Sequence, residues 1–254
     1  MPLLEVKSVS KHFGGVLALD SISLSVGEGE IVGLIGPNGA GKTSFFNCVT
    51  GLTRIDEGEM VFGKGALRLN GLPPHKILEA GIARTFQNLR IFKNMSLLEN
   101  VAVGFHSRTR SGLRDSLLRT RRMRLEEKMI FEQSMELLRF MGLESQGNEI
   151  ASNLSYGSQK RLEIARAMAC GPKLLLLDEP VAGMNPREKE EIIALIRDIR
   201  RKNIAILLIE HDMKVVMPLS DRVVVMDEGA KIAEGVPESV QKNKRVIQAY
   251  LGEE

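Results

Sequence analysis

The segment 36–43 has the residue types and the spacing of a loop that binds phosphate groups. It matches the pattern G-x-x-x-x-G-K-[ST], follows the apolar run Ile31–Ile35 and precedes a helical pattern, Thr43–Thr50. Glycines let backbone N–H groups curl around phosphate oxygens, and the N-terminus of a helix adds a partial positive charge. The residues that we expect to bind the phosphates of a nucleotide are Gly36, Pro37, Asn38, Gly39, Ala40, Gly41, Lys42, Thr43 and Ser44.

Two side chains of this loop, Lys42 and Thr43, carry its charge and its hydroxyl group. The Lys42 ammonium can reach the β- and γ-phosphates of a nucleotide, and the Thr43 hydroxyl can be a ligand of Mg²⁺. The loop alone does not separate a kinase, a small GTPase and a motor-like ATPase. The choice therefore depends on residues further along the chain.

Two carboxylates, Asp178 and Glu179, follow an apolar run of four leucines, Leu174–Leu177. A strand that is buried on both faces holds its terminal carboxylate rigidly, so Asp178 can bind Mg²⁺ through water beside Thr43. Glu179 comes next and is expected to point toward the γ-phosphate, which makes it the candidate that polarises the attacking water. The two motifs together favour hydrolysis of a nucleotide that is bound with Mg²⁺.

The elements that must position these residues alternate apolar strands with amphipathic helices. A helix is predicted to begin at Asn185-Pro186, because Asn caps helices well and Pro suits the first helical position. The alternation predicts an α/β fold with a mostly parallel sheet. The predicted strands are Ile31–Ile35, Ile82–Phe86, Leu174–Leu177, Ile204–Ile209 and Arg222–Met226.

Two regions depart from this alternation. The residues of Leu4–Val26 alternate in polarity and predict an antiparallel β region, whereas Ser96–Leu143 has a charged, helical pattern. We therefore expect a single domain with three parts. These are a β-rich part at about 1–30 and 55–72, an inserted helical part at about 92–160, and a phosphate-loop core in the remainder of 1–254.

The composition argues against several classes of protein. The net charge of +3 implies no strong polyanionic partner, and the absence of Trp and the presence of only two Tyr disfavour an RNA-binding sheet. No apolar run approaches the about 18 residues that span a bilayer. The N-terminal segment lacks the apolar core of a secretory signal. We expect a soluble, cytoplasmic chain that contacts a membrane only through a partner.

A turn of small residues, 154–159, opens a cationic helix ahead of the leucine run. Its hydroxyl group and the helix N-terminus can bind a γ-phosphate. The turn resembles the signature motif of ATP-binding cassette (ABC) ATPases, which is usually Leu-Ser-Gly-Gly-Gln. In that family two subunits face head to tail, and each signature binds the ATP of the partner. The resemblance assigns this role in trans to Ser155, Tyr156, Gly157, Ser158 and Gln159.

The resemblance extends over the whole chain and implies roles for further positions. Phe13 stands where the family has an aromatic side chain that stacks on adenine, and residues 182–185 match the loop that contacts the partner across the dimer. Gln87 matches the glutamine that senses Mg²⁺ and the attacking water, and His211 matches the histidine that contacts the γ-phosphate. ATP and Mg²⁺ are the implied cofactors. The implied catalytic residues are Glu179, His211 and Gln87, and the implied metal ligands are Thr43, Gln87 and Asp178.

Three residues depart from the family's usual motifs. Tyr156 replaces the first signature Gly, Ser158 replaces the Gln, and Asn185 replaces the Asp of the dimer-contact loop. Ser155 and Gly157 are kept, so phosphate binding is expected to be preserved. The strength and timing of dimer closure do not follow from the sequence.

A finer resemblance is to the ATP-binding subunit of branched-chain amino-acid importers. It rests on the segments "GIARTFQNLRIFKNMSLLENV", "LSYGSQKRLEIARAMA", "LLLLDEPVAGMNP" and "VIQAYLGE". It implies integral membrane permease subunits, a second, related ATPase subunit and an extracytoplasmic substrate-binding protein as partners, at the cytoplasmic face of the inner membrane. Because the chain has one phosphate loop and one signature, it must pair with that relative or with a second copy of itself. No nucleic-acid partner is expected.

The importer subunit also has a lengthened helical part, which a basic stretch at 106–128 matches. This stretch also has three acidic residues, Asp115, Glu126 and Glu127. Its simplest interpretation is a solvated helical face. A surface that faces anionic lipid headgroups is the alternative, and DNA binding comes third. Its basic residues are Arg108, Arg110, Arg114, Arg119, Arg121, Arg122, Arg124 and Lys128.

Other functions share part of this pattern. ATPases of urea or short-amide importers and of lipopolysaccharide export resemble it, including the C-terminal "YLGE". Soluble cassette ATPases that act on nucleic acid or the ribosome usually have two cassettes or an inserted coiled coil, and small-molecule kinases lack the signature. The sequence therefore indicates a transport ATPase, with branched-chain amino acids as the expected cargo.

Overall fold

The computed structural model describes residues 2–109 and 120–251. Parts of two segments discussed above lie outside the described residues. They are Arg110, Arg114, Asp115 and Arg119 of the basic stretch, and Gly252 and Glu253 of the C-terminal motif.

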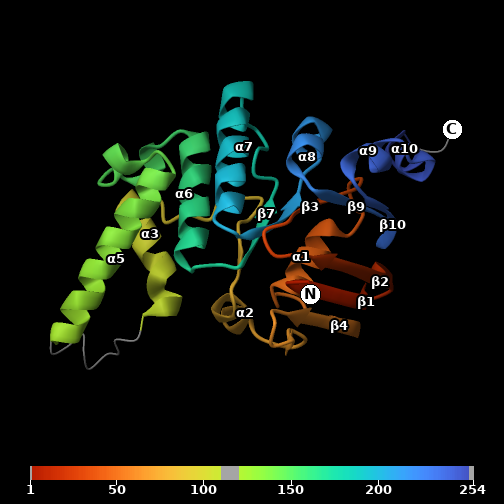
Figure 1. Cartoon of the computed structure of the whole chain (residues 1–254), viewed down its shortest axis with the longest axis horizontal. Coiled ribbons are helices and arrows are strands. Elements are labelled where there is room, and N and C mark those ends of the chain that lie inside the picture. The colour runs from red at the N-terminus through yellow and green to blue at the C-terminus, as the bar shows by residue number, and fades with distance from the viewer. Residues whose placement is uncertain (1, 110–119, 252–254) are drawn as a thin grey trace.

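Buried parallel strands form the middle of the larger sheet (Figure 1). Within the described residues its strand order is β10-β9-β3-β8-β7-β6, parallel from β9 to β6, with β10 antiparallel at the edge. Every residue of β3, β7 and β8 is buried, as expected for parallel strands that are covered on both faces. The predicted α/β fold is thus confirmed. The strands are β3 (Ile31–Ile35), β6 (Ile82–Arg84), β7 (Leu174–Asp178), β8 (Ala205–Ile209), β9 (Arg222–Asp227) and β10 (Ala230–Gly235).

The strand β6 is shorter than the sequence predicts. It was expected to extend to Phe86, but it ends at Arg84. The backbone of Phe86 is instead bound by two side chains of the helix α6 (Tyr156–Ala169), which are those of Lys160 and Glu163. Competition from these buried side chains therefore ends the strand.

A smaller antiparallel sheet lies beside the first helix, as the alternating residues predict (Figure 1). Its strand order is β2-β1-β4-β5, and the helix α1 (Lys42–Val49) shares one apolar cluster with it and with the larger sheet. Phe45 and Phe46 of α1 are fully buried in that cluster. The small sheet thereby supports the helix that begins at the phosphate loop. Its strands are β1 (Leu4–Phe13), β2 (Val16–Val26), β4 (Glu57–Phe62) and β5 (Leu67–Arg68).

A second apolar cluster joins the other face of the sheet to the remaining long helices. In Figure 1, α6 stands beside α7 (Pro186–Arg201), and α3 (Leu97–Gly104) and α5 (Arg121–Phe140) lie farther from the sheet. α7 begins as predicted, because Asn185 and Glu188 form a capping box and Pro186 holds the first position. The short helical elements are α2 (Pro74–Ala80), η1 (Phe105–Arg108), η2 (Glu144–Gln146), η3 (Ala151–Asn153), α8 (Met213–Leu219), α9 (Pro237–Gln241) and α10 (Lys244–Leu251).

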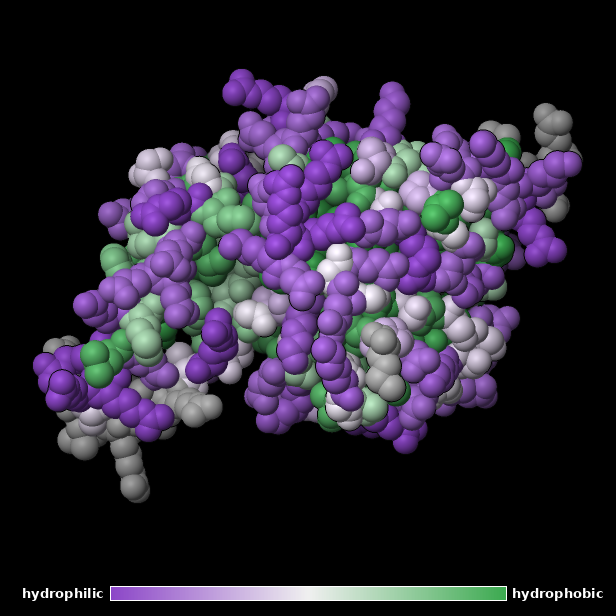
Figure 2. Space-filling model, in the orientation of Figure 1, coloured by the Kyte–Doolittle hydropathy of each residue, from purple (hydrophilic) through white to green (hydrophobic). Residues whose placement is uncertain are grey.

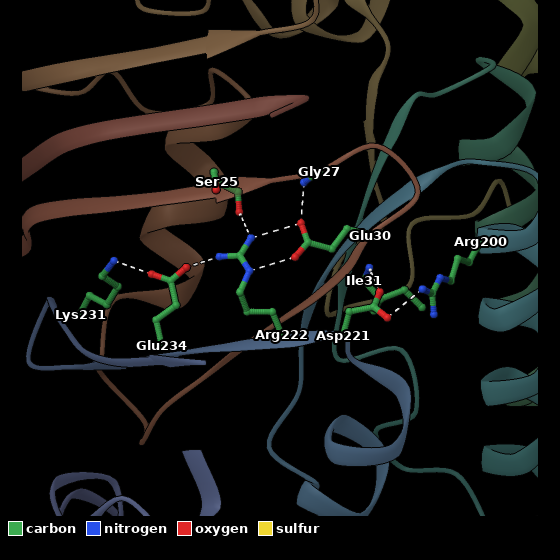
Figure 3. A network of polar contacts seen from close by, with 9 residues as sticks. All are labelled: Ser25, Gly27, Glu30, Ile31, Arg200, Asp221, Arg222, Lys231 and Glu234. Atoms are coloured by element: carbon green, nitrogen blue, oxygen red, sulfur yellow. Dashed lines mark hydrogen bonds and ion pairs between the residues drawn. The ribbon is translucent and has the colours of Figure 1, made fainter. Parts of the chain in front are cut away.

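Charged side chains fasten the N-terminal ends of the parallel strands (Figure 3). Arg222, the first residue of β9, donates to both carboxylate oxygens of Glu30, to the carbonyl of Ser25 and to Glu234 of β10. Its neighbour Asp221 accepts from the Ile31 backbone N–H at 2.9 Å. This network ties β3, β9 and β10 together at the end of the sheet opposite to the phosphate loop. The C-terminal ends of the strands are not part of this network, and the candidate active site lies there.

The described part of the basic stretch is exposed. Arg121, Arg122, Arg124 and Lys128 are all exposed on α5, which fits a solvated helical face and a lipid-facing surface equally. Figure 2 shows that hydrophilic residues dominate the visible face, with apolar residues gathered over the helices at the left. Across residues 2–109 and 120–251, no helix combines the length and the apolar character that crossing a bilayer requires.

Candidate active site

The phosphate loop links the C-terminal end of β3 to the N-terminus of α1. Two of its glycines are required by the backbone. Gly36 has φ 151°, and a Cβ atom there would collide with the carbonyl oxygen of Met226. Gly41, the N-cap of α1, has φ 95°, a backbone conformation that residues other than Gly rarely adopt. These conformations give the loop its tight curl.

Lys42 lies across the mouth of this loop. Its Nζ donates to the carbonyl oxygens of Gly36 and Pro37 at 2.7 and 2.8 Å. Burial lowers the pKa of the Lys42 ammonium, although the nearby carboxylates of Glu179 and Asp178 oppose the shift. The ammonium therefore contacts the loop and lies near the two carboxylates.

Asp178, at the end of β7, forms a buried ion pair that the sequence interpretation missed. Its Oδ2 lies 2.7 Å from Nη2 of Arg84, and the two side chains are only 3% and 6% exposed. Arg84 also donates to Oδ1 of Asn47 at 2.6 Å and stacks between the rings of Phe46 and Phe86. Arg84 thereby connects α1, β6 and β7. The sequence did contain a sign of this pair, which is an Arg inside a strand that is otherwise predicted to be buried. A buried cation needs an anionic partner.

Glu179 has an unusual backbone conformation for a residue other than Gly. Its φ is 46°, and its N–H is held by the carbonyl of Ile209 at 2.9 Å. Its carboxylate accepts a hydrogen bond from Nε2 of Gln87 at 3.2 Å and lies 3.8 Å from Nδ1 of His211. The structure therefore brings together all three side chains that the sequence resemblance named as catalytic. Such local strain is found at functional sites.

His211 follows β8, and its imidazole is 62% exposed. The residue before it, Glu210, is fully buried and accepts from the backbone N–H groups of Val181 and His211, both at 3.1 Å. Burial raises the pKa of Glu210, against the opposing effect of these hydrogen bonds. Glu210 thus links the chain after Glu179 to the chain that carries His211, a role for which the sequence gave no signal.

The signature turn caps α6. Ser155 Oγ accepts from the Ser158 N–H at 3.3 Å, and Gln159 Nε2 donates to the Leu154 carbonyl at 3.0 Å. In Figure 1, α6 stands to the left of α7 and β7, whereas α1 begins on the other side. The structure therefore does not bring the signature turn to the phosphate loop of the same chain.

Two aromatic residues outside the catalytic cluster differ in what they contact. Phe13, at the end of β1, is 49% exposed and has Lys11 over one face of its ring, so part of the ring is open to a ligand. Burial raises the pKa of Tyr250 to about 12, and the nearby backbone of Gly36 opposes that shift. α10 therefore contacts the phosphate loop directly. The sequence interpretation quoted "VIQAYLGE" but gave Tyr250 no role.

Two family models match the chain. Residues 19–182, more than half of the chain, match the family described as "ABC transporter". Residues 230–254 match the one described as "Branched-chain amino acid ATP-binding cassette transporter". The chain therefore belongs to the ABC transporter family, and the resemblance inferred from its motifs is confirmed.

Full-length relatives place the chain within that family. It is 46% identical over 253 residues to the "High-affinity branched-chain amino acid transport ATP-binding protein LivG" of Salmonella typhimurium, with 99% of this chain and 98% of that protein covered. It is 44% identical over 260 residues to the protein BraF of Pseudomonas aeruginosa, which has the same description, with 99% and 98% covered.

Solved structures agree with the fold. A nucleotide-free ATP-binding cassette from an ABC transporter has a TM-score of 0.86 and 34% identity, with all of both chains covered. The ADP conformation of an ATP-binding cassette of an ABC transporter has the same values. The fold of this chain is thus that of an ATP-binding cassette.

The first prediction concerns the buried pair of Arg84 and Asp178. Replacing Arg84 with Met leaves the Asp178 carboxylate buried without its partner, which should lower the free energy of unfolding by about 3–5 kcal/mol. The matched control is Arg139→Met, because Arg139 pairs with Glu144 on the surface and its loss should change stability little. Urea unfolding measures both variants. Equal stability of Arg84→Met and the unmodified protein would contradict the assigned role.

Proposed function

We propose that this chain is the ATP-hydrolysing subunit of a membrane importer for branched-chain amino acids. The observation that carries the proposal is the meeting of Gln87, Glu179 and His211 beside the phosphate loop. The cargo is inferred from relatives that match over their full length and carry that description. The chain acts as one domain, with the β-rich part at about 1–30 and 55–72 and the helical part at about 92–160.

The phosphate loop binds ATP through its backbone N–H groups and the N-terminus of α1. Lys42 exchanges its contacts with the loop carbonyls for contacts with the β- and γ-phosphates. Phe13 stacks on the adenine with its exposed face. These residues belong to one chain, so this chain can bind ATP alone.

The residues near the γ-phosphate also suit Mg²⁺. Thr43, Gln87 and Asp178 offer the oxygen ligands that this ion prefers, and the nucleotide phosphates complete the set. Among residues 2–109 and 120–251, no cluster of three or more His, Cys, Asp or Glu could hold a metal by itself. When bound with ATP, Mg²⁺ neutralises charge on the phosphates.

Hydrolysis depends on the three side chains that meet at Glu179. The Glu179 carboxylate accepts a proton from the attacking water, and Gln87, whose Nε2 donates to that carboxylate at 3.2 Å, orients the water. His211 contacts the γ-phosphate from the end of β8. The backbone N–H of Glu179 donates to the carbonyl of Ile209, and this bond keeps the general base in position during the proton transfer.

The second half of each site comes from a partner subunit. The signature turn lies away from the phosphate loop of its own chain, so Ser155 and Gly157 bind the γ-phosphate of the ATP held by the partner. Tyr156, Ser158 and Gln159 shape that turn. The partner is a second copy or a related ATPase. Membrane permeases and an extracytoplasmic binding protein complete the importer, and the chain lies at the cytoplasmic face of the inner membrane.

Lys42→Ala should weaken ATP binding itself, because the ammonium is a point charge on the phosphates. Saturating ATP should stabilise the unmodified chain by RT ln(1 + [L]/Kd), about 2.7 kcal/mol at 100 times Kd. The variant should lose most of that thermal shift. The control Lys64→Ala, a change at an exposed lysine, should keep it. An unchanged thermal shift in Lys42→Ala would exclude the proposed binding of ATP by the phosphate loop.

Glu179→Gln should bind ATP but hydrolyse it about 10²–10⁴-fold more slowly, because the general base is lost. We expect labelled leucine uptake by the transporter, reconstituted in vesicles with its permeases and binding protein, to stop with it. Glu190→Gln, a change at an exposed glutamate of α7, is the control. Normal turnover in Glu179→Gln would exclude this base. ATP-driven uptake of urea in place of leucine would contradict the proposed cargo.

Mixed dimers distinguish a signature that acts in trans from one that acts in cis. Pairing a Ser155→Arg chain with a Glu179→Gln chain in one forced dimer puts both lesions into one composite site. If Ser155 acts in trans, the other site stays whole and ATPase activity remains. If it acts in cis, both sites are damaged and activity is lost. Ser152→Arg, a change at a nearby exposed residue, is the control for added bulk and charge.

A further inference from the structure

A buried ion pair of α6 holds the backbone around Gln87. Oε1 of Glu163 accepts from the N–H groups of Phe86 and Arg90, at 3.3 and 3.2 Å. Nζ of Lys160 donates to the carbonyl of Phe86 at 2.9 Å and lies 3.0 Å from Oε2 of Glu163. The two side chains are 1% and 2% exposed. The segment 86–90 is therefore bound at both ends by one helix.

Burying an ion pair this deeply costs free energy, and packing alone gives no reason for a charged pair at this place. Removing two charges from water costs several kcal/mol for each ion, and apolar residues of similar size often serve a helix core equally well. The backbone supplies the reason. The chain leaves β6 at Arg84, so the polar groups of Phe86 and Arg90 lose the sheet as a partner and must find another. Lys160 and Glu163 provide it.

The same helix carries a second functional feature at its start. α6 begins at the cap residue Ser155, and Lys160 and Glu163 follow within its first two turns. Gln87 lies inside the held segment, and its side chain reaches Glu179. One rigid element thus bears both the signature turn and the anchor of the Gln87 loop.

We propose that Lys160 and Glu163 are a positioning pair that fixes the Gln87 loop to the signature helix, so that Gln87 and Ser155 move as one unit. The inference rests on the proposed function, in which Gln87 serves the nucleotide of its own chain and Ser155 serves that of the partner. Movement of the signature turn onto the partner's ATP then sets Gln87 in its own site. The pair therefore couples the two ATP sites of a dimer.

The test replaces both charges at once. Lys160→Met with Glu163→Leu keeps the core filled, so any loss of stability comes from the backbone groups that lose their partners. It leaves three backbone groups of the Gln87 segment without their partners. In the assembled transporter, kcat should fall by about 10²-fold, the cost typical of misplacing a reacting group by about 1 Å, and the KM for ATP should stay unchanged. The cooperativity of hydrolysis with ATP should be lost.

A conservative variant separates positioning from a merely structural role. Lys160→Met with Glu163→Gln keeps a side-chain oxygen that accepts from both N–H groups, so it should recover most of kcat and of the cooperativity. The matched control is Arg139→Met with Glu144→Gln, which removes a surface pair that does not touch the Gln87 loop. This control should behave as the unmodified protein does.

Hydrogen exchange gives a measurement on the unmodified protein. The N–H groups of Phe86 and Arg90 should exchange as slowly as those inside α6, and faster in the Met/Leu variant only. Fast exchange of both groups in the unmodified protein would overturn the inference. A folded Met/Leu variant with normal kcat would do the same.

A reference variant, Gln87→Ala, tests the role of Gln87 separately from that of the positioning pair. If Gln87→Ala loses activity while the Met/Leu variant does not, the positioning pair fails and the proposed function stands. If Gln87→Ala itself keeps normal kcat, the proposed role of Gln87 fails. Loss of kcat in both, with ATP affinity preserved, supports the inference.

Discussion

The parallel register of β6, β7 and β8 is the constraint on which the site depends. Arg84 lies opposite Leu176, and Asp178 lies opposite Ile209, so the three strands end at one edge. Gln87, Glu179 and His211 each follow one of these ends within three residues. Neighbouring parallel strands lie about 4.8 Å apart, so side chains at their ends converge without any long loop. A slip of one residue in this register would separate the three groups.

The two carboxylates at this edge, Asp178 and Glu179, differ in how their charge is compensated. Arg84 neutralises Asp178 from within the core, whereas Lys42 is half-buried and lies close to Glu179 and Asp178 at the mouth of the loop. The Glu179 carboxylate accepts from the amide of Gln87 and lies 3.8 Å from the exposed imidazole of His211. One carboxylate is therefore fixed and the other stays available to chemistry. The same division appears in α6, where buried Lys160 and Glu163 hold a loop whose working side chain points elsewhere.

The sequence predicted the parts of this site that depend on local pattern. Three such patterns predicted local structure: the glycine spacing of residues 36–43, the leucine run before Asp178 and the Asn185-Pro186 cap. Each could be predicted because the interactions that define it involve residues only a few positions apart. The sequence did not predict the end of β6 at Arg84, nor the pairing of Arg84 with Asp178. Both depend on contacts between residues more than 70 positions apart, about which a local pattern carries no information. Tyr250 was missed for the same reason, since its partner Gly36 lies at the other end of the chain.

We propose that one nucleotide is held where Lys42, Gln87, Glu179 and His211 converge. The most direct test is a crystal structure of the Glu179→Gln chain grown with Mg²⁺ and ATP. We expect the γ-phosphate within hydrogen-bond reach of Lys42 and His211, with Gln87 beside the metal. We also expect that Ser155 of the same chain lies away from that phosphate. A γ-phosphate bound to Ser155 of its own chain, or placed away from Lys42, would contradict the account.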